Sequence, residues 1–237
     1  MNGSNTPTVV LVHGAFADAS GFAGVIRELE SAGIDVVAPP NPLRSLAFDA
    51  AAVADVARAI DGPVVLVGHS YGGAVIGQAS AQADNVTGLV FLAAFGLDVG
   101  ESCASVQGPY EPSMLAKTSG PTSYDAHGAP GGPDLYIGKD AFRETFCADV
   151  PVDVADVMRV TQRPLSVAAL TENATAAGWK SKPSWYLVSQ HDNAIPPEAE
   201  RFMAARMGAV TEEIAGSHTA FIAKPVAVAA FIKKALG

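Results

Sequence analysis

The chain has 237 residues, of which 49% are hydrophobic and 16% charged, a composition typical of a folded globular protein and unlike that of a disordered one. Its 15 basic and 24 acidic side chains give a formal net charge of −9. That acidic excess argues against nucleic acid or an anionic membrane as a partner, because both bind basic surfaces.

No apolar run reaches the ~20 residues that a membrane span needs, and residues 1–7 carry no basic leader. We therefore expect a cytoplasmic protein. Cys103 and Cys147 are too few for a disulfide scaffold, so we expect unpaired thiols in that compartment. A monomer and a homodimer are both compatible with the sequence.

Short apolar runs that end at turn residues recur along the chain and predict strands. They cover residues 8–12, 34–38, 64–67, 88–93, 185–188 and 210–214. The runs are mostly continuous rather than alternating, which is typical of a parallel sheet buried on both faces. The segments between them predict helices over residues 21–31, 48–60, 71–83, 197–207 and 224–236. This alternation predicts a doubly wound α/β sheet in a single large domain.

Residues 98–182 interrupt the alternation with many prolines and glycines and with scattered aromatic side chains. The segment begins where one predicted strand ends and finishes where the next begins. An insertion at the carboxyl edge of a sheet is where a lid over a site would lie. We therefore divide the chain into a core, residues 1–97 and 183–237, and an inserted lid, residues 98–182. A merely decorative insertion is the alternative.

The sequence GHSYGG at residues 68–73 lies between a predicted strand and a predicted helix. G-x-S-x-G in that context is a nucleophile elbow, in which the serine occupies a strained turn and its hydroxyl projects above the sheet. Gly68 and Gly72 fit because the neighbouring chain passes too closely for a side chain at either position. The motif predicts Ser70 as a catalytic nucleophile.

A serine hydroxyl needs a base to become a nucleophile, and the chain offers five histidines. His218 follows the last predicted strand, in a loop at the carboxyl edge where Ser70 also lies, and is our candidate. His13 and His69 are expected to be structural, and His127 to be solvated.

The acid that orients the histidine should lie on another loop at this edge of the sheet. Asp192 comes just after a predicted strand, and the order Ser70, Asp192, His218 is the one expected for this architecture. Asp98, which follows the preceding strand, is the rival. We expect the acid to hold the tautomer of the histidine and to stabilise the imidazolium.

Two backbone N–H groups are expected to bind the oxyanion that develops during acyl transfer. One belongs to Tyr71, which follows the nucleophile at the start of a helix. The other comes from the loop after the first strand, where we favour Ala15 and keep Phe16 as the alternative.

Taken together, these motifs resemble an α/β-hydrolase from Val9 to Phe231. They are LVHGA at residues 11–15, GHSYGG at 68–73, His191-Asp192 with Ile195-Pro196 after it, and GSH at 216–218. The chain is similar to the compact branch that holds plant methylesterases, hydroxynitrile lyases and small bacterial esterases. The resemblance implies the α/β-hydrolase fold, a core of about six parallel strands under a lid, with no cofactor.

The expected function is that of a serine hydrolase that cleaves small to medium carboxylic esters through an acyl-enzyme on Ser70. Lactonase, thioesterase or perhydrolase chemistry with the same triad is an alternative, as is a receptor-like hydrolase with little turnover. No metal is expected, because no residues with metal-ligand spacing occur. The candidates for lining an apolar substrate pocket are Phe16, Phe95, Phe142, Phe146, Trp179 and Ile195.

Overall fold

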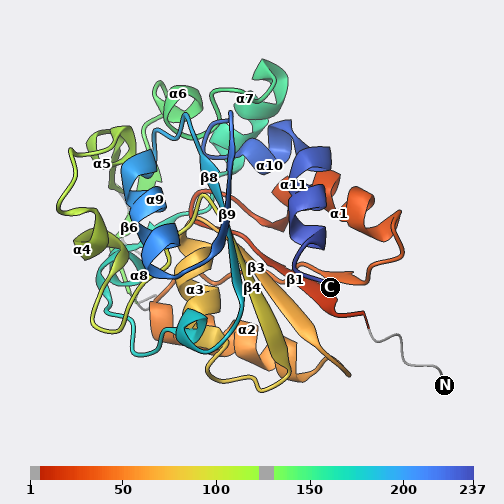
Figure 1. Ribbon diagram of the computed structural model, residues 1–237. Coiled ribbons are helices and arrows are strands. Elements are labelled where there is room, and N and C mark those ends of the chain that lie inside the picture. Colours follow the sequence, from red (N-terminus) through yellow and green to blue (C-terminus); the bar gives the residue numbers. More distant parts are fainter. Residues whose placement is uncertain (1–5, 123–130) are drawn as a thin grey trace.

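The computed structural model describes residues 6–122 and 131–237 (Figure 1). The strands of its main sheet are β1 (Thr8–Val12), β2 (Val36–Val37), β3 (Val64–His69), β4 (Val86–Leu92), β8 (Ser184–Ser189) and β9 (Val210–Ile214). All six pair in parallel, in the order β2-β1-β3-β4-β8-β9. This confirms the predicted α/β-hydrolase fold with six parallel strands.

The continuous apolar strands bury both faces of the sheet, because successive side chains of a strand point to opposite sides. In the register of β1 with β3, Val10 lies opposite Leu66 and Val9 opposite Val65. The first pair belongs to one hydrophobic cluster and the second pair to another, and all four side chains are fully buried. The sheet is therefore the middle layer of three.

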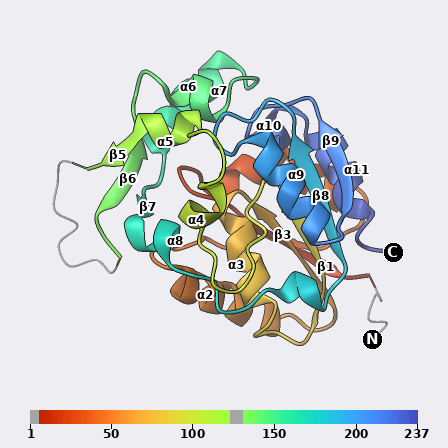
Figure 2. The same cartoon turned by 60° about the vertical axis from the view of Figure 1, so that its left-hand side comes forward.

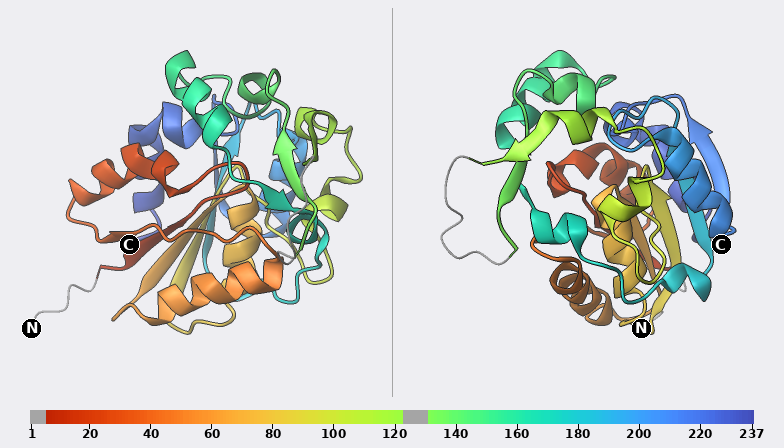
Figure 3. Two further views of the ribbon diagram at one scale, coloured as in Figure 1. Left: turned by 180° about the vertical axis from the view of Figure 1, so that it is seen from behind. Right: turned by 90° about the vertical axis from the view of Figure 1, so that its left-hand side faces the viewer.

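Helices form the two outer layers. They are α1 (Ala23–Glu30), α2 (Leu46–Arg58), α3 (Tyr71–Ala79), α9 (Pro197–Arg206), α10 (Ala220–Ala223) and α11 (Pro225–Lys233), with the 3-10 turn η1 (Ala19–Phe22) ahead of α1. Side chains of α1 and α11 pack into one cluster, and those of α2, α3 and α9 into the other. The two sets of helices accordingly cover opposite faces of the sheet (Figures 1 and 3).

The boundaries differ from the predicted ones where turn residues intervene. The strand expected over residues 34–38 shrinks to β2, because only Val36 and Val37 pair with β1 and prolines follow at 39 and 40. The helix expected over residues 71–83 ends at Ala79.

Residues 98–182 have a different architecture from the core. Their elements are α4 (Cys103–Gln107), α5 (Met114–Thr118), β5 (Ser119–Pro121), β6 (Asp134–Ile137), α6 (Phe142–Phe146), α7 (Val152–Thr161), β7 (Leu165–Ser166), α8 (Val167–Thr171) and η2 (Gly178–Lys180). The three strands form a small antiparallel sheet, and Figure 2 shows β5, β6 and β7 with α5 to α8 at the left and top of the molecule. Cys103 and Cys147 are buried free thiols. None of the helices described is both long and apolar enough to span a membrane. The division into core and lid stays a prediction.

The backbone segments approach one another closely at the junction of β1, β3 and α3. A Cβ atom at Gly72 would lie 2.3 Å from the carbonyl oxygen of Val12, and one at Gly68 would lie 2.5 Å from the carbonyl oxygen of Gly72. Real Cβ atoms do not approach backbone atoms so closely. The first turn of α3 can therefore rest on the ends of β1 and β3 only with glycine at both positions.

We expect Gly72→Ala to lower the free energy of unfolding by about 2 kcal/mol or more, because the new methyl group would push α3 away from β1. Gly77→Ala on the same helix is the matched control: apart from the backbone of its own helix and its chain neighbours, no atom of the described residues lies within 4 Å of the added Cβ. This control should be neutral or stabilising by up to about 1 kcal/mol. Urea unfolding of both variants measures the difference. Equal stability of the two would contradict the packing described here.

Candidate active site

Ser70 occupies the sharp turn between β3 and α3. Its φ of 55° and ψ of −124° lie outside the regions that a serine normally adopts, and such a conformation persists only where the surroundings fix it. The Ser70 N–H donates to the carbonyl of Leu92 (3.2 Å), and its carbonyl accepts from the N–H groups of Gly73 (2.9 Å) and Phe95 (3.1 Å). These three hydrogen bonds hold the elbow, and the serine is only 5% exposed.

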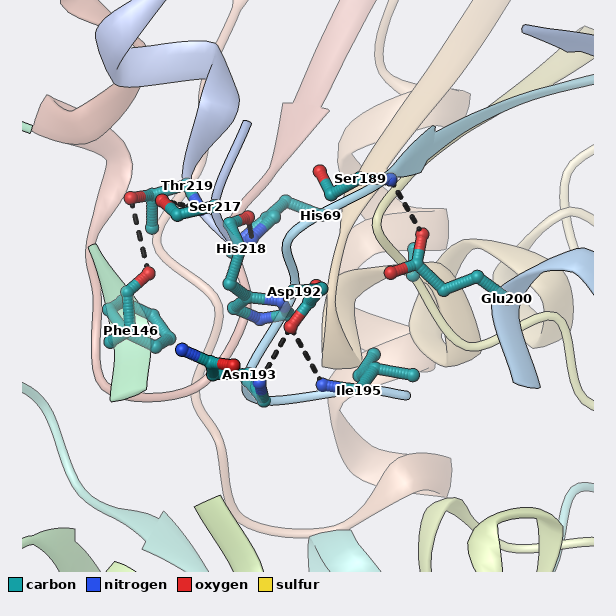
Figure 4. A network of polar contacts seen from close by, with 12 residues as sticks. His69, Phe146, Ser189, Asp192, Asn193, Ile195, Glu200, Ser217, His218 and Thr219 are labelled. Carbon is teal, nitrogen blue, oxygen red and sulfur yellow. Dashed lines mark hydrogen bonds and ion pairs between the residues drawn. The ribbon is translucent and has the colours of Figure 1, made fainter. Parts of the chain in front are cut away.

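His218 and Asp192 form a buried pair in the loops after β9 and β8 (Figure 4). Nδ1 of His218 lies 2.5 Å from Oδ2 of Asp192. The other oxygen, Oδ1, accepts from the backbone N–H groups of Ala194 (2.6 Å) and Ile195 (2.8 Å). Three N–H donors around one carboxylate fix its orientation.

The second ring nitrogen of His218, Nε2, is buried and has no hydrogen-bond partner among the described residues. The Ser70 hydroxyl makes no hydrogen bond within the described part of the chain either. The ring of Phe146, from α6, packs over His218 with the ring centroids 5.2 Å apart. The arrangement leaves one nitrogen free to take a proton while the carboxylate holds the other.

Further hydrogen bonds fix the loop that carries Ser217 and His218. His69 Nε2 donates to the carbonyl of His218 (2.9 Å), and burial holds the pKa of His69 well below its ordinary value, so this ring is neutral. Ser217 donates to the Asp149 carboxylate through its N–H (3.0 Å) and through its hydroxyl. The predicted structural role of His69 agrees with these contacts.

Asp98, the rival acid, has a different partner. Its carboxylate lies 2.5 Å from the ammonium of Lys180 and not beside His218. That ammonium also holds the pKa of Asp98 below its ordinary value.

The loop after β1 carries the second set of candidate N–H donors. Phe16 has a φ of 59°, and its N–H donates to the carbonyl of Arg163 (3.0 Å), so that group is already used. Ala15 N–H and Tyr71 N–H make no hydrogen bond within the described residues. Tyr71 is also anchored through its hydroxyl, which donates to Asp49 (2.7 Å).

His13 holds this loop in place. Its Nε2 accepts from the Asn41 N–H (2.9 Å), so Nδ1 carries the proton and donates to the Gly14 carbonyl (2.9 Å). The Asn41 side chain returns a hydrogen bond to the His13 carbonyl (2.9 Å). Burial lowers the pKa of His13 to about 4, so the ring is neutral at neutral pH. His127, the histidine expected to be solvated, lies outside the described residues.

Two cavities lie next to this loop, and Phe16 lines both. One, of about 320 Å³, is mostly apolar and includes Leu115, Leu165 and Leu170. The other, of about 510 Å³, lies against α1 and α7. Of the six residues predicted to line a pocket, only Phe16 borders either cavity. Phe95, Phe142, Phe146 and Ile195 are buried in the core, and Trp179 donates through its indole N–H to the carbonyl of Leu97 (2.8 Å). Their role in substrate binding stays a prediction.

Polar residues that hold the site but were not expected to do so from the sequence include Asn41, Asp49, Asp149 and Glu200, whose Oε2 accepts from the backbone N–H of Ser189 (3.1 Å). Asn41 and Asp149 act on loops that are distant in the sequence, and no local motif marks them. Glu200 could have been noticed from the helical spacing. It lies three residues before Met203 and four before Ala204, on the face of α9 that is buried.

The chain matches the α/β hydrolase family over residues 9–231. It is 27% identical to the α/β hydrolase nvfD of Aspergillus novofumigatus, with 98% of this chain and 97% of that one covered. It is 28% identical to methylesterase 2 of Arabidopsis thaliana over 60% of this chain and 57% of that one.

Solved structures give the same result for the fold. An extracellular α/β-hydrolase from a Paenibacillus species, described as a structural and functional homologue of tobacco salicylic acid binding protein 2, superposes with a TM-score of 0.79 at 25% identity. It covers 97% of this chain and 98% of its own. Polyneuridine aldehyde esterase superposes with a TM-score of 0.83 at 22% identity, covering 96% and 98%.

The lowered pKa of His13 makes a prediction about stability. The unfolded chain takes up a proton on this histidine near its ordinary pKa of 6.5, whereas the folded chain does so only near 4. Stability is therefore lost as the pH falls through this window. Between pH 7 and pH 5 we expect the wild type to lose about 2 kcal/mol relative to His13→Gln.

Urea unfolding at the two pH values gives this difference, and His191→Gln, at an exposed histidine, is the matched control. An equal loss in the wild type and in His13→Gln would contradict a neutral, buried His13.

Proposed function

The chain belongs to the α/β hydrolase family, and from this premise we propose that it is a serine carboxylesterase that forms an acyl-enzyme on Ser70. The observation that carries the proposal is the buried His218–Asp192 pair with its free Nε2, at the same edge of the sheet as the strained Ser70 elbow. Relatives named methylesterase support an ester as the substrate.

In the first step, Nε2 of His218 takes the hydroxyl proton as Ser70 Oγ attacks the ester carbonyl carbon. The positive charge that forms on the ring is stabilised by Asp192, which keeps its own charge and holds Nδ1–H in place. A neutral His218 with a free Nε2 is the form that this step needs.

The carbonyl oxygen becomes an oxyanion in the same step. The unpaired N–H groups of Ala15 and Tyr71 are the proposed donors, and removal of one such donor typically costs about 3 kcal/mol of transition-state stabilisation. Tyr71 is the first residue of α3, so the positive end of the helix dipole adds to its effect. Because Phe16 N–H is bonded to Arg163, Ala15 is the better candidate of the two.

When the tetrahedral intermediate collapses, His218 returns the proton to the leaving alkoxide, which departs as the alcohol. A water molecule then repeats the sequence on the acyl-enzyme: it gives a proton to His218, attacks the carbonyl, and releases the carboxylic acid and Ser70. Both halves use the same residues, and no other reactant than water is needed.

The proposed substrates are small to medium, uncharged carboxylic esters. The mostly apolar cavity of about 320 Å³ beside Phe16 is of the size of a small-molecule site. An anionic group placed there would lose its hydration and would meet no cation among the lining residues, whose charged member is Glu111.

We expect a fluorophosphonate to add to Ser70 once per chain, with turnover of p-nitrophenyl acetate by the unlabelled protein. Ser70→Ala should lose the adduct and at least about 10³-fold of the activity, because the nucleophile is gone. Intact-mass spectrometry measures the adduct, and the ester assay measures the activity. Activity of the variant within tenfold of the wild type would mean that another group is the nucleophile.

The assignment of the acid is tested by two variants at the same pH. Asp192→Asn should lose at least about 10³-fold in kcat, since an amide can no longer stabilise the imidazolium or fix the tautomer. Asp98→Asn should retain wild-type activity within a factor of two or so, because its carboxylate pairs with Lys180. An active Asp192→Asn beside an inactive Asp98→Asn would reverse the assignment.

A further inference from the structure

Glu200 is a carboxyl group that the mechanism above does not use, although it lies beside the proposed catalytic residues. It projects from α9 toward the end of β8 and is 0% exposed. Its Oε2 accepts from the backbone N–H of Ser189 (3.1 Å). Its Oε1 is buried and receives no hydrogen bond from the described residues, and Figure 4 shows this oxygen on the side that faces Asp192.

Two adjacent carboxyl groups in one buried site do not both ionise, because their charges repel and neither is solvated. The hydrogen-bond donors decide which of them keeps the proton. Asp192 receives three N–H groups, including that of His218, whereas Glu200 receives only that of Ser189. The proton therefore belongs on Glu200, whose Oε1–H can then donate to Asp192.

We propose that Glu200 is a protonated positioning residue that donates a hydrogen bond to Asp192 and so tunes the base His218. This role rests on the proposed function, because it adds Glu200 as a fourth member to the proposed triad of Ser70, Asp192 and His218. A donor on Asp192 lowers the basicity of that carboxylate and hence its pull on the His218 proton. It also supplies the buried Oε1 with a partner, which an ionised Glu200 would lack.

The other groups around Glu200 agree with a neutral carboxyl group. Burial, followed by the charge of Asp192 and its hydrogen bond, raises the pKa of Glu200 well above its ordinary value of 4.5. Arg201, the next residue, is exposed and pairs with Glu213 at 2.8 Å. The Tyr186 hydroxyl lies nearby but donates to the Ala94 carbonyl. No cation among the described residues pairs with the Glu200 carboxyl group.

The first experiment measures proton linkage in folding, with Glu200→Gln as the variant. The amide can donate to Asp192 and accept from Ser189, as the protonated acid does, but it cannot ionise. Above pH 4.5 the unfolded wild type has lost the Glu200 proton, whereas the folded protein keeps it. The unfolding equilibrium constant of the wild type should thus rise about tenfold per pH unit relative to Glu200→Gln.

Glu198→Gln is the matched control, since Glu198 lies on the same helix but is exposed. Its unfolding should follow the pH dependence of the wild type within a factor of about two. If the wild type and Glu200→Gln have the same pH dependence between pH 5 and 8, Glu200 is ionised in the folded protein and the proposal is wrong.

The second experiment follows the pKa of His218 by NMR of histidine-labelled protein. Glu200→Gln should leave it unchanged, because one neutral donor replaces another. Glu200→Leu removes the donor, so Asp192 becomes more basic and the His218 pKa should rise by about one unit. A fall of the His218 pKa in Glu200→Gln would show that the substitution had removed a negative charge. An unchanged His218 pKa in both variants would show that Glu200 and His218 are not coupled. Either result would overturn the proposal.

Neither readout depends on ester turnover. If the protein shows both effects but hydrolyses no ester, the proposed carboxylesterase function is wrong and the proposed role of Glu200 stands. Glu200→Leu also deprives the Ser189 N–H of its acceptor, which lowers the stability of this variant. The unfolding comparison between the wild type and Glu200→Gln then decides the question alone.

Discussion

The close approach of α3 to the ends of β1 and β3 is the constraint on which the site depends. Where the backbone of Gly72 touches the Val12 carbonyl, no side chain fits, so the helix begins almost against the sheet. Ser70, with its φ of 55°, lies against the loop after β1, where a Cβ atom at Gly14 would lie 2.6 Å from the Cβ of Ser70. A wider turn would separate the nucleophile from the proposed oxyanion donors, whatever side chains were present.

The sequence predicted those parts of the molecule whose signals are local. Buried parallel strands such as Val64–His69 are continuous apolar runs, and the GHSYGG turn carries its own glycines, so the sheet and the elbow could be located without coordinates. The short β2 was overestimated, because a run of apolar residues does not report that only two of them find partners at a sheet edge.

Residues that act across the fold could not be predicted in this way. Asn41 meets His13 and Asp149 meets Ser217 only because the loops of different strands converge at one edge of the sheet. The segment from 98 to 182 is irregular, with helices too short to show a clear period, so its aromatic residues could be proposed for a pocket but not placed. Phe146 packs on His218, and Phe16 borders two cavities. Both placements depend on tertiary contacts alone.

The same segment leaves the sheet after β4 and returns at β8, and these two strands are hydrogen-bonded neighbours, with Leu89 opposite Ser184. An excursion between adjacent strands can be lengthened, shortened or replaced without altering the register of the sheet. Ser70 lies before it, and Asp192 and His218 lie after it, so an exchange of residues 98–182 would keep the three proposed catalytic residues but replace Phe146 and Asp149, which contact His218 and Ser217. Exchange of this segment between relatives is therefore a route by which the surroundings of the proposed catalytic residues change while those residues stay the same.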